Sequence, residues 1–350
     1  MTSSSPVRFA LAGFGAWGKL HAQSIAGNPD AKLVAITAPS EASREEAEKA
    51  YPDALIFADV REMISQAEFD IIDIATPSHT HREIAIAAME KGRQVLLEKP
   101  MAITLDDCKA IVAAAKQHRV HLAVGHELRL SSQWGEIKRI IEHGTIGEPQ
   151  YVLVELLRKP YRLGASGWRY DQSRVGSWVL EEPIHFFDLA RWYLEGSGDP
   201  VELYAYGNSR DPQRPELFDN FSAMFKYPNG SYAVVSQTLA AFEHHQTVKV
   251  SGTKGALWAG WSGALDRTLE PEYFLKVFDG EKLENVKMEK HSGEVFELRE
   301  EIAQCVEMVR TGKKPVASGT DGLWSAGLCL VAEESIRQKR PLPVGEMLKI

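Results

Sequence analysis

The sequence predicts an α/β domain built on a doubly wound parallel sheet, followed by an α+β domain with a large, mostly antiparallel, open-faced sheet. Strand and helix patterns alternate through residues 1–125, which is typical of repeated βα units with right-handed crossovers. Beyond Gly125, strand-like runs follow one another with short turns between them, which indicates antiparallel pairing. A chain of 350 residues exceeds one ordinary core, so we expect domains at residues 1–125 and 126–350.

The first strand is expected at residues 7–12, and a glycine-rich turn separates it from a helix at residues 19–26. In this GxGxxG turn, Gly13 permits a tight bend and Gly18 lets the helix pack closely on the strand. A side chain at Gly15 would obstruct a pyrophosphate, whose charge suits the N–H groups of a helix start. The motif predicts a Rossmann dinucleotide site rather than a turn without a ligand. Its expected contacts are Gly13, Phe14, Gly15, Ala16, Trp17 and Gly18.

The alternation continues to the end of the first domain. Thr104, with Asp107 three residues later, is a typical helix start. The further strands are expected at residues 32–37, 54–57, 70–75, 94–98 and 121–124, and the further helices at 43–50, 81–91 and 105–117.

The second domain opens with a helix and a strand, and then has an irregular loop at residues 158–176. The run YPNGS at residues 227–231 predicts a hairpin turn between two strands. The strands are expected at residues 150–157, 201–207, 218–227, 231–239 and 246–251, and the helices at 132–142, 183–194, 294–310 and 321–337.

Composition excludes several classes of partner. With a net charge of −8, a pI near 5.8 and no basic stripe, the chain is not expected to bind nucleic acid. Its apolar runs are too short for a membrane span, and residues 1–6 are interpreted as a disordered lead-in rather than a signal peptide. Cys108, Cys305 and Cys329 are expected to be reduced, buried thiols of a cytoplasmic protein. No spacing typical of zinc ligands is evident, so no metal is expected.

Two short motifs follow expected strands, ATPSHTH at residues 75–81 and EKP at residues 98–100. Ligands of doubly wound sheets bind at the carboxyl ends of the strands. The ammonium group of Lys99 can hydrogen-bond a reacting hydroxyl and help its proton leave, although a lysine before a proline is often simply exposed. A cis bond between Lys99 and Pro100 is a further hypothesis.

A third group of candidates begins the helix at residues 183–194, where Pro183 suits the first turn. Glu181 and His185 are four residues apart and are expected to share a face, with the carboxylate orienting the imidazole as a general base. The alternative is a buried structural histidine. Asp188 is expected to pair with His185 or with a backbone group.

The end of the second strand bears on the choice between NAD and NADP. Many NAD enzymes place a carboxylate there, whereas this chain has Ala38. Ser40 and Arg44 could receive a 2′-phosphate, although Glu41, Glu45 and Glu46 weaken that argument, so the preference for NADP is slight.

Together, GxGxxG, ATPxxxH, EKP, the glycine-rich approach to His185 and Asp188, and the tail at residues 319–335 resemble the glucose–fructose oxidoreductase, inositol dehydrogenase and rhizopine-catabolism family (Gfo/Idh/MocA) over nearly the whole chain. The resemblance implies NAD or NADP as cofactor and a proton-handling role for Lys99. Members similar to inositol dehydrogenase carry Asp where this chain has Glu181, and small or apolar residues where it has Glu182. The other expected cofactor contacts are Ala38, Ser40, Arg44, Thr76, Pro77, His81, Glu98 and Lys99.

The substrate is expected to bind between the domains. Aromatic rings and forked arginine donors of the loop at residues 158–176 suit a sugar ring, although such side chains often pack a domain interface instead. The expected substrate contacts are His126, Arg158, Trp168, Arg169, Glu182 and Asp188.

These features predict an oxidoreductase that transfers a hydride between a nicotinamide and a secondary hydroxyl or ketone of a sugar, cyclitol or sugar derivative, with Lys99, His185 and Glu181 as catalytic residues. One alternative is an NAD-dependent glycoside hydrolase of the same fold. Another is a non-catalytic sugar or nucleotide sensor, which should lack Lys99 or His185. By analogy with the family, the sheet of the second domain is expected to form a homodimer or homotetramer.

Overall fold

The computed structural model describes residues 5–345 and 347–348. The chain forms two compact units, one from residues 1–127 and 297–323 and the other from residues 128–296 and 324–350. Each unit has its own sheet. Of the N-terminal lead-in expected at residues 1–6, residues 1–4 lie outside the described part of the chain.

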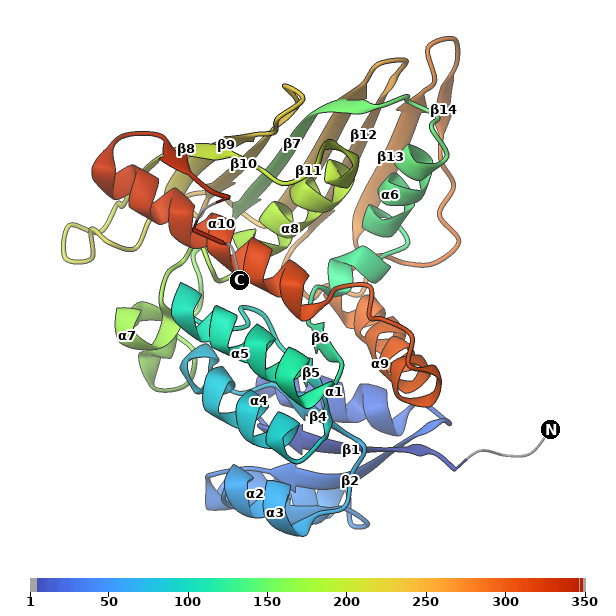
Figure 1. Cartoon of the computed structure of the whole chain (residues 1–350), viewed down its shortest axis with the longest axis vertical. Coiled ribbons are helices and arrows are strands. Elements are labelled where there is room, and N and C mark those ends of the chain that lie inside the picture. The colour runs from blue at the N-terminus through green and yellow to red at the C-terminus, as the bar shows by residue number, and fades with distance from the viewer. Residues whose placement is uncertain (1–4, 346, 349–350) are drawn as a thin grey trace. The chain divides into compact units, whose positions relative to one another are not determined.

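The first unit is built on a six-stranded parallel sheet with the order β3-β2-β1-β4-β5-β6 (Figure 1). The strand order reverses between β1 and β4, which is where doubly wound sheets bind ligands. All four residues of β4 are buried, as expected of a parallel strand covered on both faces. The strands are β1 (Val7–Ala12), β2 (Ala31–Thr37), β3 (Leu55–Phe57), β4 (Ile71–Ile74), β5 (Gln94–Leu97) and β6 (Leu122–Val124).

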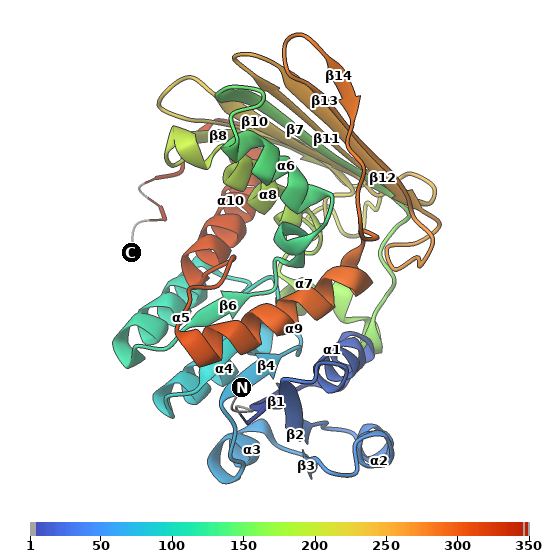
Figure 2. The same cartoon turned by 90° about the vertical axis from the view of Figure 1, so that its right-hand side faces the viewer.

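Helices cover both faces of this sheet. A chain segment from far along the sequence contributes to its core, because Ile302 and Val306 of α9 pack with Phe9 of β1 and Ile25 of α1. Figure 2 shows α9 running across the strands. Thr104 caps α5 as predicted, accepting a hydrogen bond from the Asp107 N–H at 3.2 Å. The helices are α1 (Ala16–Ala26), α2 (Glu41–Ala50), α3 (Val60–Gln66), α4 (His81–Glu90), α5 (Leu105–His118) and α9 (Glu294–Thr311).

The second unit contains a nine-stranded sheet with the order β14-β13-β12-β11-β7-β10-β9-β8-β15. Its pairings are antiparallel except that between β7 and β10, so the predicted fold class is confirmed for both units. The hairpin predicted at residues 227–231 joins β9 to β10. The strands are β7 (Pro149–Arg158), β8 (Glu202–Asn208), β9 (Asn220–Lys226), β10 (Tyr232–Thr238), β11 (His244–Gly252), β12 (Ala256–Gly263), β13 (Glu272–Phe278), β14 (Leu283–Asn285) and β15 (Leu342–Pro343).

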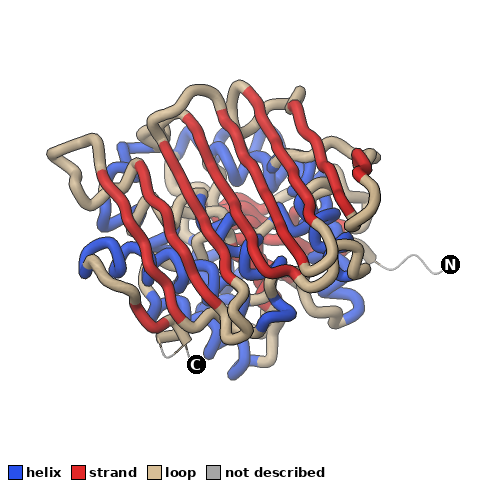
Figure 3. The backbone as a smooth tube through the Cα atoms, turned by 90° about the horizontal axis from the view of Figure 1, so that it is seen from above, coloured by secondary structure: helices blue, strands red, loops and turns tan. Residues whose placement is uncertain are grey.

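In the described part of the chain, helices pack on one face of this sheet. Phe187 of α8 stacks on Phe221 and Phe225 of β9, with ring centroids 6.2 and 5.9 Å apart. No described helix covers the opposite face, and Figure 3 shows the strands open to the viewer. The helices of this unit are α6 (Trp134–Glu142), α7 (Gln172–Val175), α8 (Pro183–Tyr193) and most of α10 (Gly319–Gln338).

The structure adds elements that the sequence pattern did not predict. α3 has only seven residues and depends on Asp59, which accepts hydrogen bonds from two backbone N–H groups at its start. β12, β13 and β14 extend the second sheet beyond the four consecutive strand runs that were expected. β12 alternates weakly because it contains two glycines, and the Phe274 ring covers one of them, Gly260.

All three cysteines are free and buried, as predicted. Among the residues that the structure describes, no helix combines the length and apolar character that crossing a membrane requires.

Candidate functional site

The predicted site residues fall in both compact units, and the first group surrounds the turn between β1 and α1. Gly13 has a φ of +101°, and a Cβ on it would lie 2.6 Å from the Ala75 carbonyl oxygen. A Cβ on Gly18 would lie 2.1 Å from the Gly13 carbonyl oxygen. A Cβ on Gly15 would meet no protein atom within 4 Å, so the fold itself does not require glycine there. This cradle at a helix N-terminus fits a dinucleotide pyrophosphate.

The other residues of the motif have distinct places. Phe14 is buried and packs edge-on against Tyr51, with the ring centroids 6.1 Å apart. Ala16 is the first residue of α1. The Trp17 ring lies edge-on to that of His21, with the centroids 5.5 Å apart, on the next turn of the same helix.

His81 joins the two motifs that follow β4 and β5. Its Nδ1 lies 2.9 Å from the Pro100 carbonyl oxygen, and its Nε2 lies 2.8 Å from the Thr76 carbonyl oxygen. Burial lowers the pKa of this ring, which favours its neutral form. His81 therefore ties the two motifs together, while Pro77 precedes the short 3-10 helix at Ser78–Thr80. The Lys99–Pro100 peptide is cis, which confirms that hypothesis.

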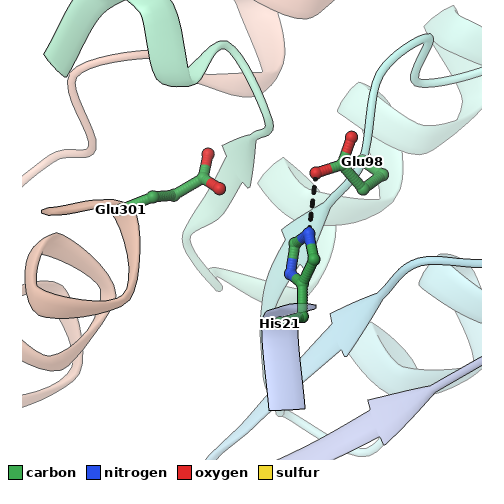
Figure 4. A group of neighbouring side chains, drawn as sticks. All are labelled: His21, Glu98 and Glu301. Carbon is green, nitrogen blue, oxygen red and sulfur yellow. Dashed lines mark hydrogen bonds and ion pairs between the residues drawn. The ribbon is translucent and has the colours of Figure 1, made fainter. Parts of the chain in front are cut away.

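A chain of buried charged side chains begins at the backbone N–H of Lys99. Glu98 Oε2 accepts a hydrogen bond from the Lys99 backbone N–H at 3.1 Å, and Glu98 Oε1 lies 3.1 Å from His21 Nε2 (Figure 4). His21 Nδ1 lies 2.7 Å from Asp73 Oδ2. Burial opposes the charge on His21, but the two carboxylates outweigh it and raise the pKa of His21 well above its usual value. Sequence reasoning missed His21 and Asp73, because neither belongs to a motif that it recognised.

Glu301 of α9 extends this cluster. Its carboxyl group points toward His21 and Glu98 (Figure 4), and one potential ligand atom from each of the three residues lies within 4.8 Å of the others. Carboxylate and imidazole groups at this spacing are a set that can bind a metal ion. However, both His21 ring nitrogens already face carboxylates, and burial raises the pKa of Glu301 well above its usual value. The imidazolium of His21 and the protonated carboxyl group of Glu301 therefore limit the negative charge of the cluster to one without a metal.

The predicted NADP-discriminating residues follow β2. Ala38 is fully buried, and Ser40 caps α2 by accepting a hydrogen bond from the Ser43 N–H at 3.2 Å. Arg44 donates to the carbonyl oxygens of Ala38 and Pro39 at 3.2 and 2.8 Å. The guanidinium group of Arg44 thus lies at the carboxyl end of β2.

His126, one of the expected substrate contacts, is buried and follows β6.

The second group surrounds the start of α8, where the structure differs from the expectation. The helix begins at Pro183, so Glu181 lies outside it and the shared helical face with His185 does not form. Glu181 instead accepts a short hydrogen bond from Arg169, and Glu182 accepts one from Arg158. Both acidic residues predicted near His185 are therefore paired with arginines predicted to contact substrate.

Asp188 also has a partner that the sequence did not predict. Its two carboxylate oxygens accept hydrogen bonds from Arg129 at 2.7 and 2.8 Å, a partner that the sequence analysis did not include. Both side chains are buried, and the Arg129 guanidinium also lies 5.1 Å from the Trp192 ring centroid. A partner 59 residues away in the sequence leaves no local signal.

Trp168 and Arg169 lie in the segment expected to be an irregular loop. Its 3-10 turns within Ala165–Tyr170 are interrupted by a kink, with φ values of +54° at Ser166 and +68° at Gly167, and the four-residue helix α7 follows. Trp168 packs against a small apolar cluster that includes Tyr161 and Trp178. The Arg169 guanidinium lies 5.0 Å from the Trp168 ring centroid. The aromatic side chains of this segment thus pack a local core.

His244 is a further residue that sequence reasoning missed. It is buried, and its Nε2 lies 3.1 Å from Glu182 Oε1 and 2.9 Å from Gln246 Nε2. Burial and the nearby Arg158 lower the pKa of His244 to about 4, so the ring is neutral at pH 7.

Both parts of the chain are similar to known protein families. Residues 7–126 match the model of an oxidoreductase family with an NAD-binding Rossmann fold, and residues 134–258 match the GFO/IDH/MocA C-terminal domain. The glycine cradle and this match define the class of protein, an oxidoreductase with an NAD-binding Rossmann domain.

Full-length relatives define the family. The chain is 30% identical to the uncharacterized oxidoreductase YrbE of Bacillus subtilis, covering 97% of each chain. It is 26% identical to the myo-inositol 2-dehydrogenase of Thermotoga maritima, covering 98% of this chain and 100% of the relative. The chain belongs to the Gfo/Idh/MocA family of oxidoreductases. A crystal structure of aldose-aldose oxidoreductase from Caulobacter crescentus shares the fold, with a TM-score of 0.81, 22% identity and coverage of 97% of this chain and 99% of that one.

Proposed function

We propose that the protein is an NAD(P)-dependent dehydrogenase that interconverts a secondary hydroxyl and a ketone on a neutral sugar or cyclitol. The observation that carries the proposal is the dinucleotide cradle at Gly13–Gly18 in the same unit as Lys99, which follows β5 at the ligand-binding edge of the parallel sheet. The relative from Thermotoga maritima is named as a myo-inositol 2-dehydrogenase, which supports a polyhydroxylated substrate.

In this proposal, the turn between β1 and α1 holds the cofactor pyrophosphate and the residues after β4 lie near its nicotinamide. The bound nicotinamide supplies the hydride acceptor or donor. Arg44 and Ser40, at the end of β2, favour a 2′-phosphate and hence NADP, because Arg44 can form bidentate hydrogen bonds and Ala38 offers no carboxylate for a ribose hydroxyl.

The chain's own residues handle the proton. Lys99 hydrogen-bonds the substrate oxygen through its ammonium group and stabilises the charge that develops there. His185 serves as general base, and Glu181 with Arg169 fixes the entry to α8 next to it. Three free buried thiols also support a reducing compartment such as the cytoplasm.

The charge around α8 supports a neutral substrate. A free arginine could hold an anionic substituent, but Glu182 and Glu181 accept the hydrogen bonds of Arg158 and Arg169. Asp266 lies 3.5 Å from Arg158 as a further acid. With its arginines neutralised, this region offers hydroxyl-binding donors and acceptors rather than a site for a sugar acid.

The experiment is a panel of neutral sugars, polyols, glycosides and sugar acids, each tested with NAD and NADP by the absorbance of the reduced nicotinamide. We expect turnover with a neutral polyol and a preference for NADP. Lys99→Ala is expected to lower kcat by about a hundredfold or more. Full turnover of Lys99→Ala would remove Lys99 from the mechanism, and glycoside cleavage without net cofactor reduction would indicate the hydrolase alternative.

A further inference from the structure

We propose that His21 is a positioning residue for Lys99. Its imidazolium group, held between Asp73 and Glu98, fixes the carboxylate that in turn holds the Lys99 backbone. The inference rests on the proposed function, in which Lys99 handles the substrate proton.

The contacts form one continuous chain of hydrogen bonds. Asp73 Oδ2 accepts from His21 Nδ1 at 2.7 Å, Glu98 Oε1 accepts from His21 Nε2 at 3.1 Å, and Glu98 Oε2 accepts from the Lys99 N–H at 3.1 Å. Because a carboxylate faces each ring nitrogen, the ring donates at both and carries a positive charge. Such charge-assisted bonds are short, directional and strong when buried.

The environment leaves Glu98 little freedom to move. Its side chain is buried, and a Cβ on the neighbouring Gly125 would lie only 2.9 Å from Glu98 Oε1. The nearby Trp17 side chain also favours the charged form of this carboxylate and lowers its pKa. With Glu98 constrained on these sides, the Lys99 backbone N–H has one fixed acceptor.

The elements that meet here are those on which the proposed reaction depends. His21 lies on α1, whose N-terminus forms the glycine cradle, and Asp73 lies on β4, whose end contacts that cradle at Ala75. Glu98 directly precedes Lys99 at the end of β5. The His21 imidazolium therefore connects the phosphate-binding helix to the lysine. A small displacement of a catalytic group lowers the rate strongly, so this connection should affect kcat.

Glu301 provides a matched control. It is buried beside the hydrogen-bonded triad of Asp73, His21 and Glu98, but one of its carboxyl oxygens has no hydrogen-bond partner and burial keeps it protonated. Glutamine has the same shape and is also uncharged, so Glu301→Gln should preserve the triad. A metal-ligand role for Glu301 makes the opposite prediction, because an amide is a poor substitute for a ligating carboxylate.

The test compares His21→Gln, Asp73→Asn and Glu301→Gln in the intact protein, with kcat, KM for the alcohol and the dissociation constant of the cofactor measured for each. We expect His21→Gln to lower kcat about tenfold to a hundredfold while KM for the alcohol changes by less than about threefold. Asp73→Asn, which keeps the hydrogen bond but weakens the cation, should lower kcat less. Glu301→Gln should stay within about twofold of the parent. If His21→Gln does not fold, the kcat of Asp73→Asn relative to that of the parent decides the test.

The same substitutions in a Lys99→Ala background separate positioning from general support. If His21 acts through Lys99, His21→Gln should have no further effect on the residual turnover of Lys99→Ala. An equal loss in both backgrounds would overturn the inference. So would a stoichiometric metal in the purified protein that Glu301→Gln abolishes. If Lys99→Ala is impaired while His21→Gln and Asp73→Asn keep full kcat, only this inference fails, whereas full turnover of Lys99→Ala refutes the proposed function itself.

Discussion

At the scale of single residues, the glycines of the cradle differ in why glycine is needed: Gly18 for packing of the fold, and Gly15 for binding of the cofactor. A Cβ on Gly18 would lie 2.1 Å from the Gly13 carbonyl oxygen, whereas a Cβ on Gly15 would meet no protein atom within 4 Å. We expect Gly18→Ala to destabilise the fold by about 1–3 kcal/mol or more, because the clash involves backbone. Gly15→Ala should keep the parent stability and lose cofactor affinity. Urea unfolding and cofactor titration of both variants measure the two effects, and equal destabilisation by both would contradict this division.

His244 makes a prediction about pH. Its pKa in the folded chain is about 4, whereas an unfolded histidine titrates near its ordinary value of 6.5. Below pH 6.5 the unfolded chain therefore binds more protons, and stability is lost as the pH falls from there toward 4. Between pH 7 and pH 5 the loss is about 2 kcal/mol.

The check is urea unfolding of the parent and of His244→Gln at pH 7 and pH 5. The variant lacks the titrating ring, so its stability should fall less between these pH values, by about 2 kcal/mol. Identical pH dependence of the two proteins would show that His244 does not carry this effect.

Residues in a motif could be predicted from the sequence because their signal is local. Gly13 and Gly18 have the conformation and the packing that the GxGxxG spacing predicted, and the Lys99–Pro100 bond is cis. Pairings across the fold could not be predicted in this way. Asp188 meets Arg129 from 59 residues away, and His21 meets Asp73 from 52 residues away, so no spacing rule links the partners.

At the scale of elements, α10 contains a buried acid that lowers the stability of the folded protein at high pH. Glu333 is 3% exposed, and burial raises its pKa to about 7. The unfolded carboxyl group ionises near 4.5, so stability is lost as the pH rises from 4.5 through 7. Glu333→Gln should remove about 2–3 kcal/mol of the loss between pH 5 and pH 8.

Glu334 on the same helix is the matched control for this measurement. Both Glu333 and Glu334 lie 3.0 Å from Arg337, but the Glu334 side chain is 37% exposed. Glu334→Gln should therefore change stability little at either pH, because exposed ion pairs contribute little. A similar pH effect of both substitutions in thermal unfolding would argue against burial as the cause.

Long elements with strong patterns could be predicted, and short ones could not. The buried strands of the first sheet and the helix α5 follow from apolar runs and a capping threonine. α3 is too short for a helical period, and β14 has only three residues, all exposed. Their formation depends on tertiary contacts rather than on local pattern.

At the scale of the whole molecule, the chain passes through the first unit twice, since residues 297–323 join residues 1–127. The apolar side chains of α9 complete the core that β1 and α1 begin. No local pattern in α9 indicates which sheet it covers, because an amphipathic pattern predicts that one face of a helix is buried but not what that face packs against. Removing the C-terminal segment would therefore remove part of the Rossmann core.

The uncovered face of the nine-stranded sheet makes the last prediction. Alternate residues of each strand point to this face, and among them Tyr206, Met224, Trp258 and Phe274 are 67%, 52%, 57% and 48% exposed. An exposed apolar surface of this kind is typical of protein interfaces, and a second copy of the same sheet would offer a matching face. We expect a homo-oligomer in light scattering, and the double substitution Trp258→Glu/Phe274→Glu should convert it to a monomer, because paired negative charges would be buried in the interface.

A control separates this effect from a general loss of apolar surface. Leu55 is 57% exposed on β3 of the first sheet, so Leu55→Glu changes charge and hydrophobicity away from the uncovered face. It should leave the oligomer intact. Dissociation by Leu55→Glu, or persistence of the oligomer in the double variant with an unchanged unfolding temperature, would place the interface elsewhere. Because the substituted side chains point away from the core of their sheet, both variants are expected to keep the fold.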